Sequence, residues 1–257
     1  MFRHMGKAYP RVANLGDGCL SNGYREEPYV HVEIWSDIAC PWCYVGKRRF
    51  EAALAAFEHR DAVRVTWRSF ELDPHAPRER PVDGATHLSE KYGTSRAQAL
   101  EMQRGMTQVA AGVGLDFRFD LARGGNTFDA HRLLHLAAAH ELQDALKERL
   151  MCAYLTQGEP IGDPAVLERL ALEVGLPQDG VRDVLETDRF AAEVRDDERT
   201  AASLRISAVP FFVVDRAVGA AGAQPAEVLG ELLQSAWDAR PGLAVVPTGA
   251  SCDIDGC

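Results

Sequence analysis

The first regular pattern in the chain is an alternation of apolar and polar residues from Val30 to Trp35, which predicts a β-strand. Helical spacing follows, with Phe50, Leu54 and Phe57 on one face. A second alternation at residues 63–70 predicts another strand, which ends at the prolines beyond it. Because the return between the strands is so short, we expect a βαβ unit with parallel strands and a right-handed crossover.

Helical periodicity then continues almost without interruption from about residue 86 to residue 204. Several helices in this stretch are introduced by residues that favour a helix start. These residues are Thr94-Ser95, Asn126-Thr127 and Asp163-Pro164. The sequence therefore predicts an α-helical insertion after the βαβ unit.

The strand pattern returns near the end of the chain. Residues 208–214 are an apolar run that contains a proline near its start, and they predict a strand. Residues 217–221 predict a short antiparallel edge strand, and Gln224-Pro225 marks the start of a last helix. We therefore expect one sheet whose strands come from both sides of the helical insertion.

Composition and charge narrow the class of partner. The chain has 257 residues and a formal net charge of -10, and its pI is near 5.3. An acidic protein is not attracted to nucleic acid or to an anionic membrane surface. No run approaches the roughly 18 apolar residues that a membrane span requires. We expect protein or small-molecule partners.

Two of the six cysteines, Cys40 and Cys43, lie at the predicted junction of the first strand and the first helix. A cysteine at a helix start faces unsatisfied backbone N–H groups, which stabilise its thiolate and lower its pKa. Pro41 suits the first helical position. We expect Cys40 to attack a disulfide and Cys43, one turn further in, to be the buried resolving thiol.

A zinc half-site has the same cysteine spacing as this motif. No second Cys-x-x-Cys and no Cys-x-x-His follows at finger spacing, so the redox interpretation is favoured. His131 and His135 share a predicted helix face, but no carboxylate or cysteine lies nearby at ligand spacing. We expect no metal among the catalytic groups.

The proline at the start of the later strand is the second candidate site. In thioredoxin-type proteins a cis-proline at such a position faces the active disulfide, and we expect the Val209-Pro210 bond to be cis. The backbone of Val209 would then be free to pair with an extended substrate segment. An ordinary trans proline at an edge strand is the alternative.

With these residues placed, the chain resembles the DsbA-like thioredoxin superfamily. Within it the chain is similar to the FrnE-like group, which is related to 2-hydroxychromene-2-carboxylate isomerases and kappa-class glutathione transferases. The resemblance covers about residues 30–240. It rests on four separated blocks, which are SDIACPWCYVGKRRF at 36–50, NTFDAHR at 126–132, VPFFV at 209–213 and GAQP at 222–225.

The resemblance implies an α/β protein of thioredoxin-like fold with a large α-helical insertion domain. The expected division of the chain is a polar leader at 1–29, a discontinuous thioredoxin-like domain at 30–78 and 205–240, the insertion at 79–204, and a C-terminal tail at 241–257. The leader lacks the continuous apolar stretch of a secretory signal, so we expect a cytoplasmic protein.

The expected activity is disulfide exchange with protein dithiols or disulfides, with roles in oxidative or metal stress. Oxidase, reductase and isomerase directions all remain open, as do the oligomeric state and the electron partner, for which glutathione and a thioredoxin system are candidates. The residues expected to bind substrate are Val209, Pro210, Pro41, Trp42 and Asn126.

Two alternatives accompany this expectation. One is a glutathione-dependent isomerase or transferase, but those relatives typically have serine at the position of Cys40. The other is a metal-binding stress protein that uses its thiol pairs. Cys252 and Cys257, in the tail, are expected to be a second redox pair. The alternatives are that they form a soft-metal site or that they have no function.

Two polar residues near these motifs have open roles. Asp37 directly precedes the motif, and it either accepts a proton from Cys43, if it is buried, or caps the helix. His131 either makes contacts at the junction with the insertion or lines the cleft with Asn126.

Overall fold

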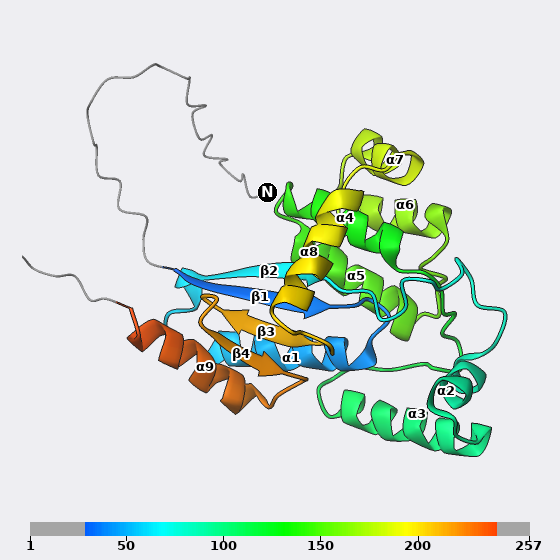
Figure 1. Cartoon of the computed structure of the whole chain (residues 1–257), viewed down its shortest axis with the longest axis horizontal. Helices are drawn as coiled ribbons and strands as arrows, with labels where there is room; N and C mark the ends of the chain where they lie inside the picture. The colour runs from blue at the N-terminus through cyan, green and yellow to red at the C-terminus, as the bar shows by residue number, and fades with distance from the viewer. Residues whose placement is uncertain (1–28, 241–257) are drawn as a thin grey trace, which may run out of the picture.

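The computed structural model describes residues 29–240. Its centre is one four-stranded sheet in the order β2-β1-β3-β4 (Figure 1). The strands are β1 (Val30–Ser36), β2 (Val63–Ser69), β3 (Phe211–Val214) and β4 (Val218–Ala221). Strands β1 and β2 are parallel, as predicted, whereas β3 runs antiparallel to both β1 and β4.

Helices cover the two faces of this sheet. Helices α1 (Pro41–Ala56) and α9 (Ala226–Asp238) pack side by side on one face, where Phe50, Phe212 and Leu229 belong to one apolar cluster. Helix α8 (Ala191–Ser203) crosses the other face (Figure 1). A 3-10 turn, η1 (Arg60–Ala62), leads into β2.

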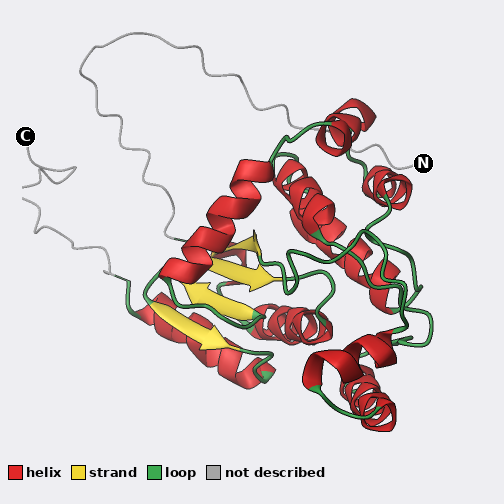
Figure 2. Ribbon diagram, turned by 45° about the vertical axis from the view of Figure 1, so that its right-hand side comes forward, coloured by secondary structure: helices red, strands yellow, loops and turns green. Residues whose placement is uncertain are grey.

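The remaining helices lie between β2 and α8 in the sequence and beside the sheet in space (Figure 2). They are α2 (Gly84–Tyr92), α3 (Arg96–Ala111), α4 (Phe128–Ala138), α5 (Gln143–Leu155), α6 (Pro164–Glu173) and α7 (Gln178–Glu186). Helices α4 to α7 share one apolar core, whose largest buried side chains are leucines. Helices α2 and α3 form a pair set apart from this group (Figure 1).

Local signals placed several helix starts correctly. The Ser95 hydroxyl oxygen accepts a hydrogen bond from Gln98 N, and Gln98 Oε1 accepts one from Ser95 N, which forms a capping box. Asp163 caps α6 through Ala165 N. The helical character predicted for this stretch is therefore confirmed, while the domain boundaries at residues 78 and 204 stay predictions.

One strand prediction was too long. The strand expected at residues 208–214 begins only at Phe211. Pro210 has no N–H to donate to the sheet, and its carbonyl oxygen accepts a hydrogen bond from Gly222 N at 2.8 Å. Residues 208–210 therefore form a loop at the edge of the site described below, instead of pairing with β1.

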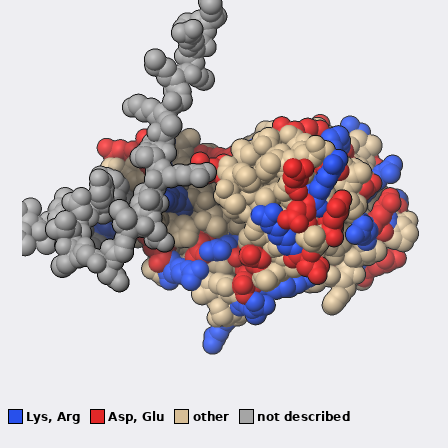
Figure 3. All heavy atoms as spheres, turned by 90° about the horizontal axis from the view of Figure 1, so that it is seen from above, with Lys and Arg blue, Asp and Glu red and all other residues tan. Residues whose placement is uncertain are grey.

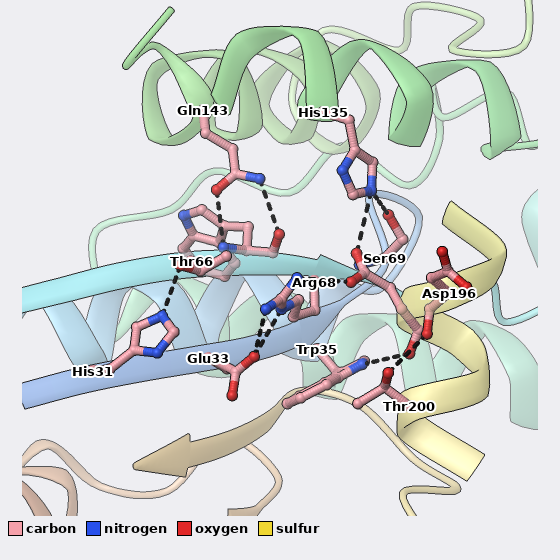
Figure 4. A network of polar contacts seen from close by, with 12 residues as sticks. His31, Glu33, Trp35, Thr66, Arg68, Ser69, His135, Gln143, Asp196 and Thr200 are labelled. Atoms are coloured by element: carbon pink, nitrogen blue, oxygen red, sulfur yellow. Dashed lines mark hydrogen bonds and ion pairs between the residues drawn. The ribbon is translucent and has the colours of Figure 1, made fainter. Parts of the chain in front are cut away.

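A buried polar network joins the sheet to α8 and the helical insertion (Figure 4). The Arg68 guanidinium donates to Glu33 at 2.6 and 2.9 Å and to Asp197 at 3.0 Å. Both carboxylates are almost completely buried. Although burial opposes ionisation, hydrogen bonds from Arg216 and Arg68 hold the pKa of Glu33 below its usual value.

The surface view in Figure 3 shows basic and acidic side chains intermixed on the face it presents. Many of the exposed charges pair locally, as Arg104 does with Glu101 and Arg189 with Asp183. That face therefore carries no basic stripe of the kind that binds nucleic acid. Within residues 29–240, no helix has both the length and the apolar composition needed to cross a membrane.

The contacts of Arg68 with Glu33 and Asp197 lead to a prediction about stability. Arg68→Ala leaves two buried carboxylates without their shared cation, so we expect the free energy of unfolding to fall by about 3 kcal/mol. Arg104→Ala removes an exposed ion pair and should cost less than about 0.5 kcal/mol. Urea unfolding measures both. Equal losses in the two variants would contradict the role given to Arg68.

Candidate active site

The Cys-x-x-Cys motif lies where the sequence predicted, at the start of α1. Cys40 is the N-cap residue with an extended backbone, and Pro41 occupies the first helical turn. The N–H groups of Cys43 and Tyr44 both donate to the Cys40 carbonyl oxygen, at 3.0 and 3.4 Å. Cys40 and Cys43 are free thiols; the first is 4% exposed and the second is fully buried.

The loop before β3 faces this helix start. The Val209–Pro210 peptide bond is cis. Cys40 Sγ lies 3.7 Å from the Val209 carbonyl oxygen, to which it donates. Pro210 rests on α1 at Gly46, where an added Cβ would lie 2.9 Å from Pro210 Cγ. Cys40 and Val209, which are 169 positions apart in the sequence, come into contact because Gly46 has no side chain to hold Pro210 away from α1.

The ionisation of the pair differs from the prediction. The hydrogen bond to Cys43, followed by burial, raises the pKa of Cys40, and the Val209 carbonyl favours its protonated form. Burial also opposes ionisation of Cys43, yet the hydrogen bond from Cys40 and the charge of Lys147 lower its pKa. The pKa of Cys40 is thus shifted in the direction opposite to the one expected, and because the two thiols act on each other, their ionisation belongs to the pair.

Behind the motif lies a buried acid. Asp37 accepts hydrogen bonds from Leu72 N at 2.8 Å, from Ala39 N at 3.3 Å and from His131 Nε2 at 3.3 Å. These donors offset the effect of burial and lower the pKa of Asp37, whereas burial lowers the pKa of His131. Asp37 is thus buried and ionised, and His131 contacts it from α4 across the domain junction.

Sequence reasoning missed Lys147. Its side chain enters from α5, is fully buried, and donates from Nζ to the Ser36 carbonyl oxygen at 3.1 Å. Burial lowers the pKa of Lys147 to about 8, against the opposing charges of Cys43 and Asp37. In the sequence, Lys147 lies among leucines at helical spacing, and nothing in that pattern shows whether the lysine side chain is buried or exposed.

Cys40 opens on a cavity of about 460 Å³, a size typical of small-ligand sites. Its walls come from the motif, the loop before β3, the α4 start and the α2–α3 pair. Five exposed apolar side chains border the cavity; they are Trp42, Leu72, Val82, Tyr92 and Met102. Apolar side chains of this size are rarely left exposed together unless they bind a partner. Only Trp42 among them was predicted.

Of the predicted substrate residues, Pro41, Trp42 and Val209 line this cavity. Pro210 lies against α1 instead. Asn126 is not among the lining residues; its Oδ1 accepts a hydrogen bond from Phe128 N and so helps to start α4. A contact between Asn126 and substrate stays a prediction.

Other predicted groups are not brought to the site. His135 turns to Ser69 and Asp197, away from the Asp37 partner of His131. Within residues 29–240 no cluster of three or more metal-ligating side chains is present. Cys252 and Cys257 lie outside the described residues.

Known proteins resemble this chain over most of its length. A family model for the DSBA-like thioredoxin domain matches residues 31–234. The probable DsbA oxidoreductase of Streptomyces coelicolor is 46% identical, with a TM-score of 0.80 over 89% of this chain and 98% of that one. Protein YwbO of Bacillus subtilis is 30% identical over 198 residues, which are 75% of this chain and 92% of YwbO.

A more distant structure shares the fold alone. The cytosolic disulfide reductase DsbM of Pseudomonas aeruginosa is 18% identical, with a TM-score of 0.58 over 81% of this chain and 98% of that one. DsbM has also been solved with GSH.

The contact between Gly46 and Pro210 can be tested with matched variants. Gly46→Ala places a Cβ against Pro210 and should lower the free energy of unfolding by about 1–3 kcal/mol. Gly105→Ala in α3 meets open space and should raise it by about 0.5–1 kcal/mol through helix propensity. Urea unfolding compares them, and a stabilised Gly46→Ala protein would contradict the contact.

Proposed function

The chain belongs to the family of DSBA-like thioredoxin domains, and from this premise we propose that it exchanges disulfides with protein substrates in the cytoplasm. The observation that carries the proposal is the position of Cys40, which opens on the cavity and faces the Val209 carbonyl while Cys43 is enclosed behind it. Cys40 is therefore the sulfur that a substrate reaches.

The reaction proceeds in two exchanges. Cys40 Sγ forms a bond with one substrate sulfur as the substrate disulfide breaks, and the single proton of the reduced pair stays on Cys43. The released substrate sulfur leaves as a thiolate and is protonated by water. Cys43 then loses its proton, bonds to Cys40, and releases the second substrate thiol. Two electrons have passed from the protein to the substrate.

Asp37 is placed to help the second exchange. It is buried and ionised, and its backbone carbonyl accepts a hydrogen bond from Cys40 N at 3.3 Å. A carboxylate near the motif can receive the proton that Cys43 must lose before it attacks. This supports the first of the two roles considered for Asp37 from the sequence, in place of helix capping.

Glutathione is the electron donor that we propose. Two glutathione thiols reduce the Cys40–Cys43 disulfide through a mixed disulfide and leave as one oxidised glutathione, which balances the two electrons given to substrate. The cavity beside Cys40 is large enough for a molecule of that size. The reductase of similar fold that has been solved with GSH supports the same choice.

The border of the cavity suggests which protein substrates are preferred. The exposed apolar side chains listed above stand next to Cys40, and an extended segment that pairs with the Val209 backbone would lay its own side chains over them. We expect substrates whose cysteine is flanked by apolar residues, as in unfolded chains whose core residues are exposed.

The first test uses insulin as substrate and glutathione as donor. Cys40→Ser should abolish reduction, because no attacking sulfur remains at the cavity. Cys43→Ser should accumulate a mixed disulfide between Cys40 and substrate, detected by mass spectrometry. Cys152→Ser is the control and should keep the wild-type rate, since Cys152 is a free thiol on α5 that does not line the cavity. Full activity in Cys40→Ser would refute the proposal.

The second test addresses substrate choice. Met102→Asp puts a charge on the cavity border, and it should lower kcat/KM about tenfold for a disulfide peptide with apolar flanking residues. The rate with a glycine-flanked peptide should change less than twofold. Leu172→Asp, on α6 and equally a change of an exposed apolar residue, should leave both rates unaltered. Equal losses for both peptides would exclude an apolar subsite at Met102.

A further inference from the structure

Lys147 carries its amino group into the core of the protein without an acidic partner. Its side chain is fully buried, and within residues 29–240 no carboxylate lies within ion-pair distance of Nζ. Buried charges are normally paired, because the loss of hydration is costly. A lysine kept in this state requires compensation from another negative group.

Lys47 shows what ordinary compensation looks like in the same region. It is also buried, but its Nζ forms ion pairs with Glu51, Asp144 and Glu148. Both lysines lie near the Trp67 ring, at 6.0 Å for Lys47 and 5.6 Å for Lys147. The carboxylates of this region are therefore directed to Lys47, and within the described part of the chain Lys147 Nζ donates a hydrogen bond only to the Ser36 carbonyl oxygen.

That hydrogen bond places Lys147 behind the active pair. Ser36 ends β1, directly before Asp37 and four residues before Cys40. The groups that favour the charged form of Lys147 are Cys43 on α1, Cys40 at the start of α1 and Asp37 after β1, whereas Lys47 repels it. Asp37 accepts its three hydrogen bonds from other donors. Of these groups only the thiol pair changes its charge when it is reduced, so it is the group through which Lys147 can act on the redox potential.

We propose that Lys147 is the residue that stabilises the negative charge of the reduced Cys40–Cys43 pair, so that the helical insertion helps to set the redox potential of the motif. This inference rests on the proposed function. When two electrons reduce the disulfide, one sulfur takes a proton and the other remains a thiolate beside the Lys147 ammonium. A stabilised thiolate stabilises the reduced protein and makes it the stronger oxidant.

Two variants separate the charge of Lys147 from its hydrogen bond. Lys147→Met removes both, and Lys147→Gln keeps a donor for the Ser36 carbonyl without a charge. In each, we expect the pKa of the more acidic thiol to rise by about one unit, which slows iodoacetamide alkylation about tenfold at a pH below that pKa. The equilibrium constant for reduction by glutathione should fall by up to the same factor, or up to about 30 mV.

The pH dependence gives a second signature. Because burial lowers the pKa of Lys147 to about 8, wild-type Lys147 loses its charge as the pH rises through that value. The alkylation rates of wild type and Lys147→Met should therefore differ most at acid pH and converge above about pH 9, where the thiolate of either protein is formed.

Arg149→Met is the matched control. It removes a cation from the same helix, two residues away, where Arg149 pairs with Glu173 at 2.7 Å on α6. Its alkylation profile should match that of wild type. A wild-type profile for both Lys147 variants, or for Lys147→Gln alone, or an equal shift in Arg149→Met, would overturn the proposal.

Failure of the proposed function is distinguishable from failure of this inference. Alkylation profiles report on the thiols of the whole chain without any substrate, with urea unfolding to confirm that each variant is folded. An inactive wild-type protein whose thiol pKa still rises in both Lys147 variants would refute disulfide exchange and support the role of Lys147. An active wild-type protein, with alkylation profiles that do not change in the Lys147 variants, would support disulfide exchange and refute the role of Lys147.

Discussion

The approach of the Val209–Pro210 loop to the start of α1 is the contact on which the site depends. It brings the Val209 carbonyl to Cys40 and covers the thiol on one side. The approach is possible because Gly46 leaves room for Pro210, and the hydrogen bond from Gly222 holds the loop in place. The sheet supports this arrangement, since β1 leads into the motif and the neighbouring β3 follows the loop.

The helical insertion completes the site from the other side. His131 on α4 contacts Asp37, Lys147 on α5 contacts Ser36, and α2 and α3 supply much of the cavity border. The first two contacts join the insertion to the few residues between the end of β1 and Cys40. The insertion therefore supplies both a buried cation behind the motif and a wall of the cavity in front of it.

The sequence could predict those parts of this arrangement that depend only on residues close together in the chain. The alternation at Val30–Trp35, the cap at Ser95 and the Cys40–Cys43 spacing each specify their own element, and they were recovered almost to the residue. The Lys147 contact joins positions 111 residues apart, and nothing in the local pattern of α5 marks that lysine. The α2–α3 cavity wall likewise depends on how two helices pack, which periodicity does not specify.

The ionisation of Cys40 has the same origin. A helix start does favour a thiolate, and Cys40 does occupy that position. The hydrogen bond with Cys43 and the burial of the thiol, which depend on how the chain packs, act in the opposite direction and raise the pKa of Cys40. The Val209 carbonyl, from a distant segment, also accepts a hydrogen bond from Cys40, which favours the protonated thiol. The backbone that we propose to pair with a substrate strand therefore also contacts the sulfur that we propose to attack the substrate.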